Sequence, residues 1–74
     1  LARSLGAHGS VLLGLGRAQE ACDAFAEGLR IILPFARALP GAFGELAAAL
    51  RADYMRACRE AGKEPEKGLM NGVV

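Results

Sequence analysis

Residues 9–29 constrain the fold more than any other stretch of this 74-residue chain, because one glycine divides them into two helical patterns. Apolar residues recur at helical spacing both before and after Gly16. Glycine just past a helix end suits the left-handed conformation of a C-terminal cap. A connection this short makes the second helix fold back antiparallel to the first. The stretch therefore predicts a helical hairpin that turns at Gly16.

Three helices are predicted in all, over residues 2–15, 18–33 and 42–61. The third has the clearest limits, because it follows Pro40-Gly41 and runs to Gly62, a residue typical of a C-terminal cap. Abundant alanine and few β-branched residues also favour helix over strand.

Pro34 leaves the end of the second helix open. Proline inside a helix either ends or kinks it. Residues 35–39 still have a helical pattern, and this favours a kink.

The predicted architecture is all-α: a helix–turn–helix hairpin followed by a third, capping helix, over residues 1–63. Residues 64–74 are expected to form a short helix or a tail, with Leu69, Met70, Val73 and Val74 able to pack back. Four glycines within residues 6–16 indicate close approach of another backbone, because glycine is costly inside a helix. The expected core consists of the apolar-face residues Leu12, Ala21, Phe25, Leu29, Ile32, Phe43, Leu46, Leu50 and Tyr54.

Small and large residues alternate in the hairpin at places that form a known pattern: Gly9, Leu12, Gly16, Glu20-Ala21, Phe25 and Gly28-Leu29. The pattern resembles one tetratricopeptide repeat, a helix–turn–helix unit of ~34 residues. It covers residues 3–34. Three positions depart from it: Leu5 replaces the opening aromatic residue, His8 stands where leucine is usual, and Pro34 comes one residue late.

The resemblance implies a protein–protein interaction module, a piece of a larger protein that binds a protein or peptide on a concave surface formed by first helices. In this chain that surface would be offered by Arg3, Ala7, Ser10 and Gly14. The alternative is a regulatory or oligomerisation segment of a multidomain protein whose catalytic or DNA-binding part lies elsewhere.

Residue patterns typical of catalysis or of metal and cofactor binding are absent from the sequence. His8 is the only histidine, and Glu20, Asp23 and Glu27 share one helix face that we interpret as solvated. A net charge of +1 gives no electrostatic signal for nucleic acid. No apolar run approaches the ~18 residues that a membrane span needs. The sequence therefore predicts no enzyme, no cofactor, no nucleic-acid partner and no membrane partner.

Two cysteines, Cys22 and Cys58, fall in helical patterns without metal-ligand spacing. We expect both to be free, buried thiols with no catalytic or metal role. Free thiols persist in reducing compartments, so a cytoplasmic location is expected.

Residues 29–33 are apolar on every side except at Arg30. Ile31 and Leu33 are predicted to point away from the face that holds Phe25, and together with Phe35 they would form an interface. A second copy in a homodimer, or a neighbouring repeat, would cover it. In a monomer, residues 69–74 would have to fold back over this patch.

Overall fold

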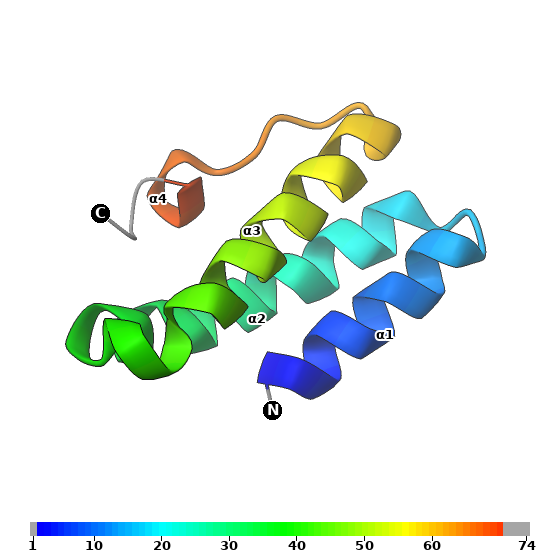
Figure 1. Cartoon of the computed structure of the whole chain (residues 1–74). Coiled ribbons are helices and arrows are strands. Elements are labelled where there is room, and N and C mark those ends of the chain that lie inside the picture. The colour runs from blue at the N-terminus through cyan, green and yellow to red at the C-terminus, as the bar shows by residue number, and fades with distance from the viewer. Residues whose placement is uncertain (1, 71–74) are drawn as a thin grey trace.

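The computed structural model describes residues 2–70. These residues form four helices and no strand: α1 (Ala2–Gly14), α2 (Ala18–Ala38), α3 (Pro40–Ala61) and α4 (Lys67–Met70). Helices α1 and α3 both run along α2 (Figure 1), and they also contact each other. The predicted all-α architecture of a hairpin and a third helix is confirmed.

Gly16 forms the predicted turn of the hairpin. Its φ of 77° is left-handed, a conformation that glycine adopts without steric cost. The amide of Arg17 donates a hydrogen bond of 2.9 Å to the carbonyl of Leu12, and the amide of Gly16 donates one of 3.1 Å to Leu13. These bonds use carbonyls that the end of α1 would otherwise leave unpaired.

Helix α2 continues through Pro34 and ends at Ala38. The limit at residue 33 is therefore too short, and the favoured alternative, a helix that continues past Pro34, is confirmed. Proline removes the hydrogen bond to the carbonyl four residues earlier, which belongs to Arg30. Both Pro34 and Arg30 are exposed, so water can satisfy that carbonyl. The helix continues after Pro34 because its next residues still pack against the core, in which Ala36 is buried.

Helix α3 begins at Pro40, two residues before the predicted start at residue 42. Proline suits the first turn of a helix, where its missing N–H would have no partner. The helix ends as predicted at Gly62, whose φ is 68°. The amide of Lys63 then donates to the carbonyl of Cys58 at 2.8 Å and closes the cap.

The core lies between α1, α2 and α3. Seven of the nine predicted core residues are buried in it: Leu12, Ala21, Phe25, Leu29, Ile32, Leu50 and Tyr54. Phe43 and Leu46 are only half-buried and pack against its edge. Phe25 is at the centre, and Gly9 of α1 packs against its ring so closely that a Cβ at Gly9 would lie 2.8 Å from a ring carbon.

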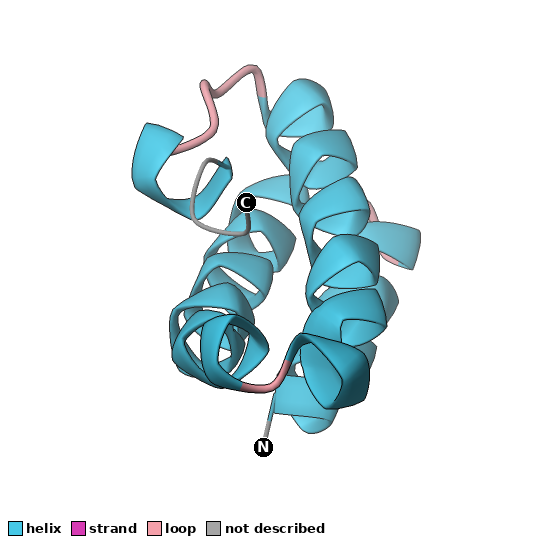
Figure 2. Cartoon of the chain, turned by 60° about the vertical axis from the view of Figure 1, so that its left-hand side comes forward, coloured by secondary structure: helices cyan, strands magenta, loops and turns pink. Residues whose placement is uncertain are grey.

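The segment after α3 folds back on α2 (Figure 2). Leu69 of α4 is buried in the same core cluster as Leu33, and Met70 packs against this cluster. Three polar contacts hold the segment. Arg30 pairs with Glu66 at 2.7 Å, Arg51 donates to the Met70 carbonyl at 3.2 Å, and the Glu66 amide donates to the Tyr54 hydroxyl at 2.9 Å. The short helix expected within residues 64–74 is thus present. Val73 and Val74 lie outside the described residues.

Candidate functional site

The predicted peptide-binding residues form one exposed stripe along α1. Arg3, Ala7, Ser10 and Gly14 follow one another at steps of four, three and four residues, and all four are exposed. Ser10 and Gly14 line a shallow groove of about 290 Å³ together with Leu13, Arg56 and Glu60. Arg3 and Ala7 lie closer to the start of α1. The stripe therefore leads into a groove between α1 and α3, and we call this the α1–α3 groove.

The α1–α3 groove is lined by one positive and one negative side chain and has open space beside Gly14. Arg56 and Glu60 supply the charges from α3, and the guanidinium of Arg56 is only loosely paired with Asp53, at 3.7 Å. A Cβ added at Gly14 would meet no atom within 4 Å. A surface of this kind can accept an extended segment by hydrogen bonds and one ion pair, but it does not enclose a small molecule.

A second groove, of about 300 Å³, lies between α1 and α2, where His8 faces the acidic face of α2. Two of the carboxylates there already have partners. Arg17 forms a bidentate pair with Glu20 at 2.7 and 2.8 Å, and Lys63 lies 3.5 Å from Asp23. Among residues 2–70, no group of three or more potential ligands is placed to hold a metal ion. These contacts support the interpretation of a solvated face.

The predicted interface of Ile31, Leu33 and Phe35 is only partly exposed. Leu33 is 5% exposed and belongs to the core, so the prediction that it lies on an open face is wrong. Ile31 is half-buried against the same core. Helix α2 packs against α3 and α4 as well as α1. A pattern within α2 alone does not reveal these neighbours.

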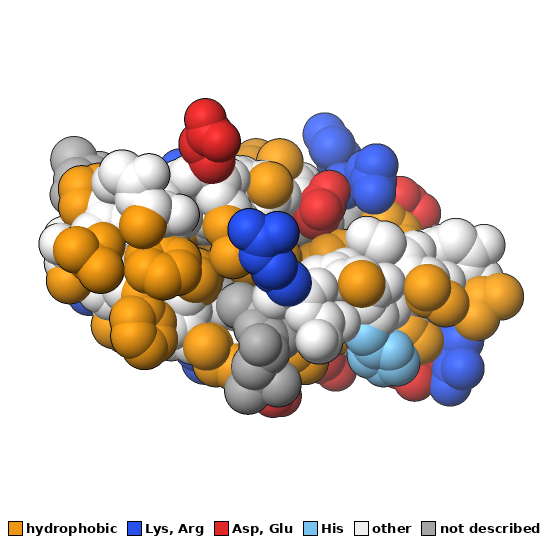
Figure 3. Space-filling view, turned by 60° about the horizontal axis from the view of Figure 1, so that its bottom comes forward, with side chains coloured by type: hydrophobic (Ala, Val, Ile, Leu, Met, Phe, Trp, Pro, Cys, Tyr) orange, Lys and Arg blue, Asp and Glu red, His pale blue; other side chains and the backbone are white. Residues whose placement is uncertain are grey.

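Phe35 does remain on the surface, where it is 53% exposed. The centroid of its ring lies 5.7 Å from that of Phe43. Leu39, which lies between the two in the sequence, is 56% exposed. Figure 3 shows hydrophobic side chains gathered at this end of the molecule, where α2 leads into α3. We call these three residues the corner patch.

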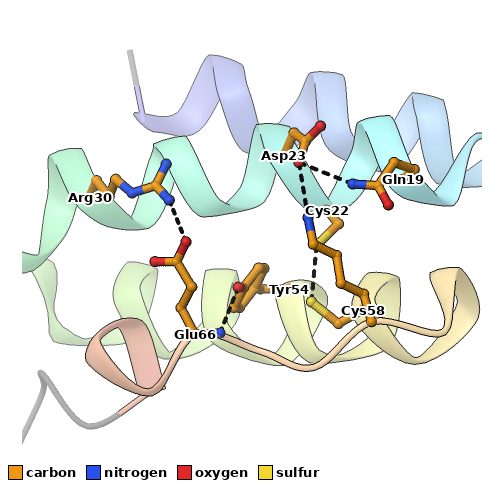
Figure 4. A network of polar contacts seen from close by, with 8 residues as sticks. Gln19, Cys22, Asp23, Arg30, Tyr54, Cys58 and Glu66 are labelled. Atoms are coloured by element: carbon orange, nitrogen blue, oxygen red, sulfur yellow. Dashed lines mark hydrogen bonds and ion pairs between the residues drawn. The ribbon is translucent and has the colours of Figure 1, made fainter.

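The two cysteines are brought together in the core. Cys22 of α2 and Cys58 of α3 are free thiols, as expected, but their sulfur atoms are only 3.0 Å apart (Figure 4). Both side chains are almost fully buried. The sequence placed each cysteine on an apolar helix face. It did not place one opposite the other, because the register between α2 and α3 is set by packing.

Burial and the neighbouring Cys58 thiol raise the pKa of Cys22 from 9.0 to about 12. The charge of Lys63 acts in the opposite direction, but its effect is smaller than that of burial. Burial also raises the pKa of Tyr54, whose hydroxyl accepts a 2.9 Å hydrogen bond from the amide of Glu66. A thiol with so high a pKa is neutral at physiological pH, and a neutral thiol is a poor nucleophile.

We expect the chain to lose stability as the pH rises from 9 toward 12. The folded state holds the Cys22 proton up to a pKa of about 12, whereas the unfolded state releases it near 9.0. Stability is therefore complete below pH 9 and falls above it. Thermal melts from pH 7 to 11 measure this, and the Cys22→Ala variant should lose less stability over the range. Equal losses in the variant and the parent would show that Cys22 is not responsible.

Arg51 is half-buried and holds the end of α4 through the Met70 carbonyl. This role depends on the returning segment, so the pattern of α3 gave no signal for it.

Comparison of the chain with protein-family models, with curated proteins and with solved structures finds no match. Within residues 2–70, no helix combines the length and the apolar content that crossing a bilayer requires.

Proposed function

We propose that the chain is a protein–protein interaction module of helical-repeat type, which binds an extended segment of a partner in the α1–α3 groove. The observation that carries the proposal is the position of Ser10 and Gly14. Residues from the stripe expected to bind peptide line a groove whose other wall is the next helix of the chain, α3. The proposed function is non-catalytic, and it needs no cofactor or metal.

The packing of the hairpin supports the resemblance to a tetratricopeptide repeat. The small residue at Gly9 meets the aromatic ring of Phe25, and the turn falls at Gly16. Helix α3 then packs against α2, as the first helix of a following unit would. Repeat units bury their faces against neighbours, so this chain fits a piece of a longer array.

The lining of the groove indicates what kind of segment would bind. The Ser10 hydroxyl can hydrogen-bond to the backbone of an extended chain, and Gly14 has no side chain that would hold that chain at a distance. The loosely paired Arg56 favours an acidic side chain at one place in that segment. We place the protein in the cytoplasm, where its two free thiols stay reduced.

Filling the groove should weaken peptide binding without unfolding the chain. Peptides selected from a random display library against the immobilised chain provide the probe, and calorimetry measures their affinity. We expect Gly14→Gln to weaken such a peptide at least ~10-fold, because the new side chain occupies open space in the groove. The fold is retained because glutamine is a better helix former than glycine.

Gly41→Gln is the matched control. Gly41 is also a helical glycine whose added Cβ would meet no atom within 4 Å, but it lies in the first turn of α3, far from Arg56. It should leave the affinity within about twofold of the parent. Equal affinity in both variants would place the peptide elsewhere and contradict the proposal.

The corner patch favours a second candidate, an oligomerisation segment. Phe35 and Leu39 are large, adjacent in space and more than half exposed, and a second copy would cover them in a two-fold dimer. Sedimentation at ~100 µM, well above the dissociation constants of specific interfaces, measures the mass. A dimer that Leu39→Lys dissociates supports this candidate. A mass equal to one chain rejects it.

A further inference from the structure

Cys22 and Cys58 are the closest pair of reactive groups that the interaction function leaves unexplained. Their sulfur atoms are 3.0 Å apart, and a disulfide bond is about 2.05 Å long, so closure needs a movement of about 1 Å. The two cysteines come from helices that pack against each other along their length. The residues that precede them, Ala21 and Ala57, are small and fully buried, so nothing bulky separates the two helices there.

We propose that Cys22 and Cys58 are a redox modification site, at which a reversible disulfide bond staples α2 to α3. The oxidant is a small disulfide such as oxidised glutathione. One cysteine thiolate attacks a glutathione sulfur, forms a mixed disulfide and releases the first glutathione as a thiolate. The second cysteine then attacks the mixed disulfide, closes the protein disulfide and releases the second glutathione. The two protons of the cysteine thiols pass through solvent to the two released thiolates.

The surroundings favour the internal disulfide over the mixed one. Both sulfurs lie inside the core, where a bound glutathione would have no room, whereas the second thiol is already in contact. The first attack requires a local opening of the α2–α3 contact, because the folded core hides both sulfurs. Burial therefore slows the oxidation of the two thiols. Once oxidation occurs, the folded structure favours the internal disulfide over a glutathione adduct.

Closing the bond would tie the hairpin to the third helix. The two cysteines are 36 residues apart. A disulfide between them lowers the conformational entropy of the unfolded chain and thereby favours the folded state. The site is independent of the proposed binding function, because its residues do not line the α1–α3 groove.

Equilibration with glutathione tests the proposal. The full chain is unfolded, refolded in buffers that contain fixed ratios of reduced and oxidised glutathione, and acid-quenched, so that burial does not limit the approach to equilibrium. Mass spectrometry then counts reduced chains, glutathione adducts and chains that have lost two hydrogen atoms. The same series in concentrated urea gives the reference for the unfolded chain.

We expect the folded chain to form the internal disulfide at least ~10-fold more readily than the chain in urea, because the fold holds the two sulfurs together. The oxidised chain should also melt roughly 10 °C higher than the reduced chain. Cys22→Ser and Cys58→Ser are the controls: each keeps one thiol and should form no internal disulfide. A folded chain that forms the disulfide no more readily than the unfolded chain overturns the proposal, and so does one that gives mainly glutathione adducts or linked dimers.

Discussion

Replacing Phe25 by alanine is expected to leave the chain largely unfolded at room temperature. Phe25 is 0% exposed and lies where α1 and α2 meet at the centre of the core. Truncating a buried phenylalanine typically costs ~3–5 kcal/mol, because both the burial of the ring and its packing contacts are lost. A core of this size rarely supplies more than about 3–5 kcal/mol of stability in total. Circular dichroism and a urea titration measure the result.

Phe35→Ala is the matched control for this change. The same ring is removed, but Phe35 is 53% exposed and packs at the edge, against Phe43. We expect it to cost no more than about 1 kcal/mol. If Phe25→Ala melted within a few degrees of the parent, or if the two variants lost equal stability, Phe25 would not be the centre of the core.

The second large effect is expected from adding a single methyl group at Gly9. The new Cβ would lie 2.8 to 3.0 Å from three ring carbons of Phe25, closer than atoms of this kind approach. The ring is enclosed on all sides and cannot withdraw. We therefore expect Gly9→Ala to destabilise the chain by ~1–3 kcal/mol, although alanine is the better helix former by about 1 kcal/mol.

Two further variants show whether contact with the Phe25 ring causes the loss of stability in Gly9→Ala. Gly44→Ala adds the same methyl group inside α3, where it would meet no atom within 4 Å, and should raise stability by up to about 1 kcal/mol. Combining Gly9→Ala with Phe25→Leu should cost less than the sum of the two single changes, because the smaller side chain frees space for the methyl group. A stabilising Gly9→Ala, or simple additivity in the double variant, would contradict the close contact.

Local signals in the sequence were sufficient for the hairpin and for the third helix. Gly16 and Gly62 mark helix ends because the conformation that they adopt depends on glycine itself. The apolar face that contains Phe25 follows from helical geometry alone, and the glycines within residues 6–16 indicated that α1 is closely approached by another helix. The sequence left the end of α2 open, although it favoured a helix that continues past Pro34, because the effect of a proline depends on exposure, which the surrounding fold decides.

Contacts between distant segments could not be predicted. Leu33 was assigned to an open face because the way α3 and α4 pack onto α2 depends on the path of the chain after α2. The pairing of Cys22 with Cys58 depends on the register between two helices, which a slide of one turn would destroy. In the candidate site, the stripe on α1 was implied by the resemblance to a tetratricopeptide repeat, but Arg56 and Glu60 joined it only through the packing of α3.

The central claim, binding in the α1–α3 groove, is tested most directly by a nuclear magnetic resonance titration of the isotope-labelled chain with a library-selected peptide. The amide signals of Ser10, Gly14 and Arg56 should move most, and those around Glu27 and Leu39 should stay nearly fixed. Shifts centred on the acidic face of α2 or on the corner patch, with Ser10 and Gly14 unmoved, would contradict the claim.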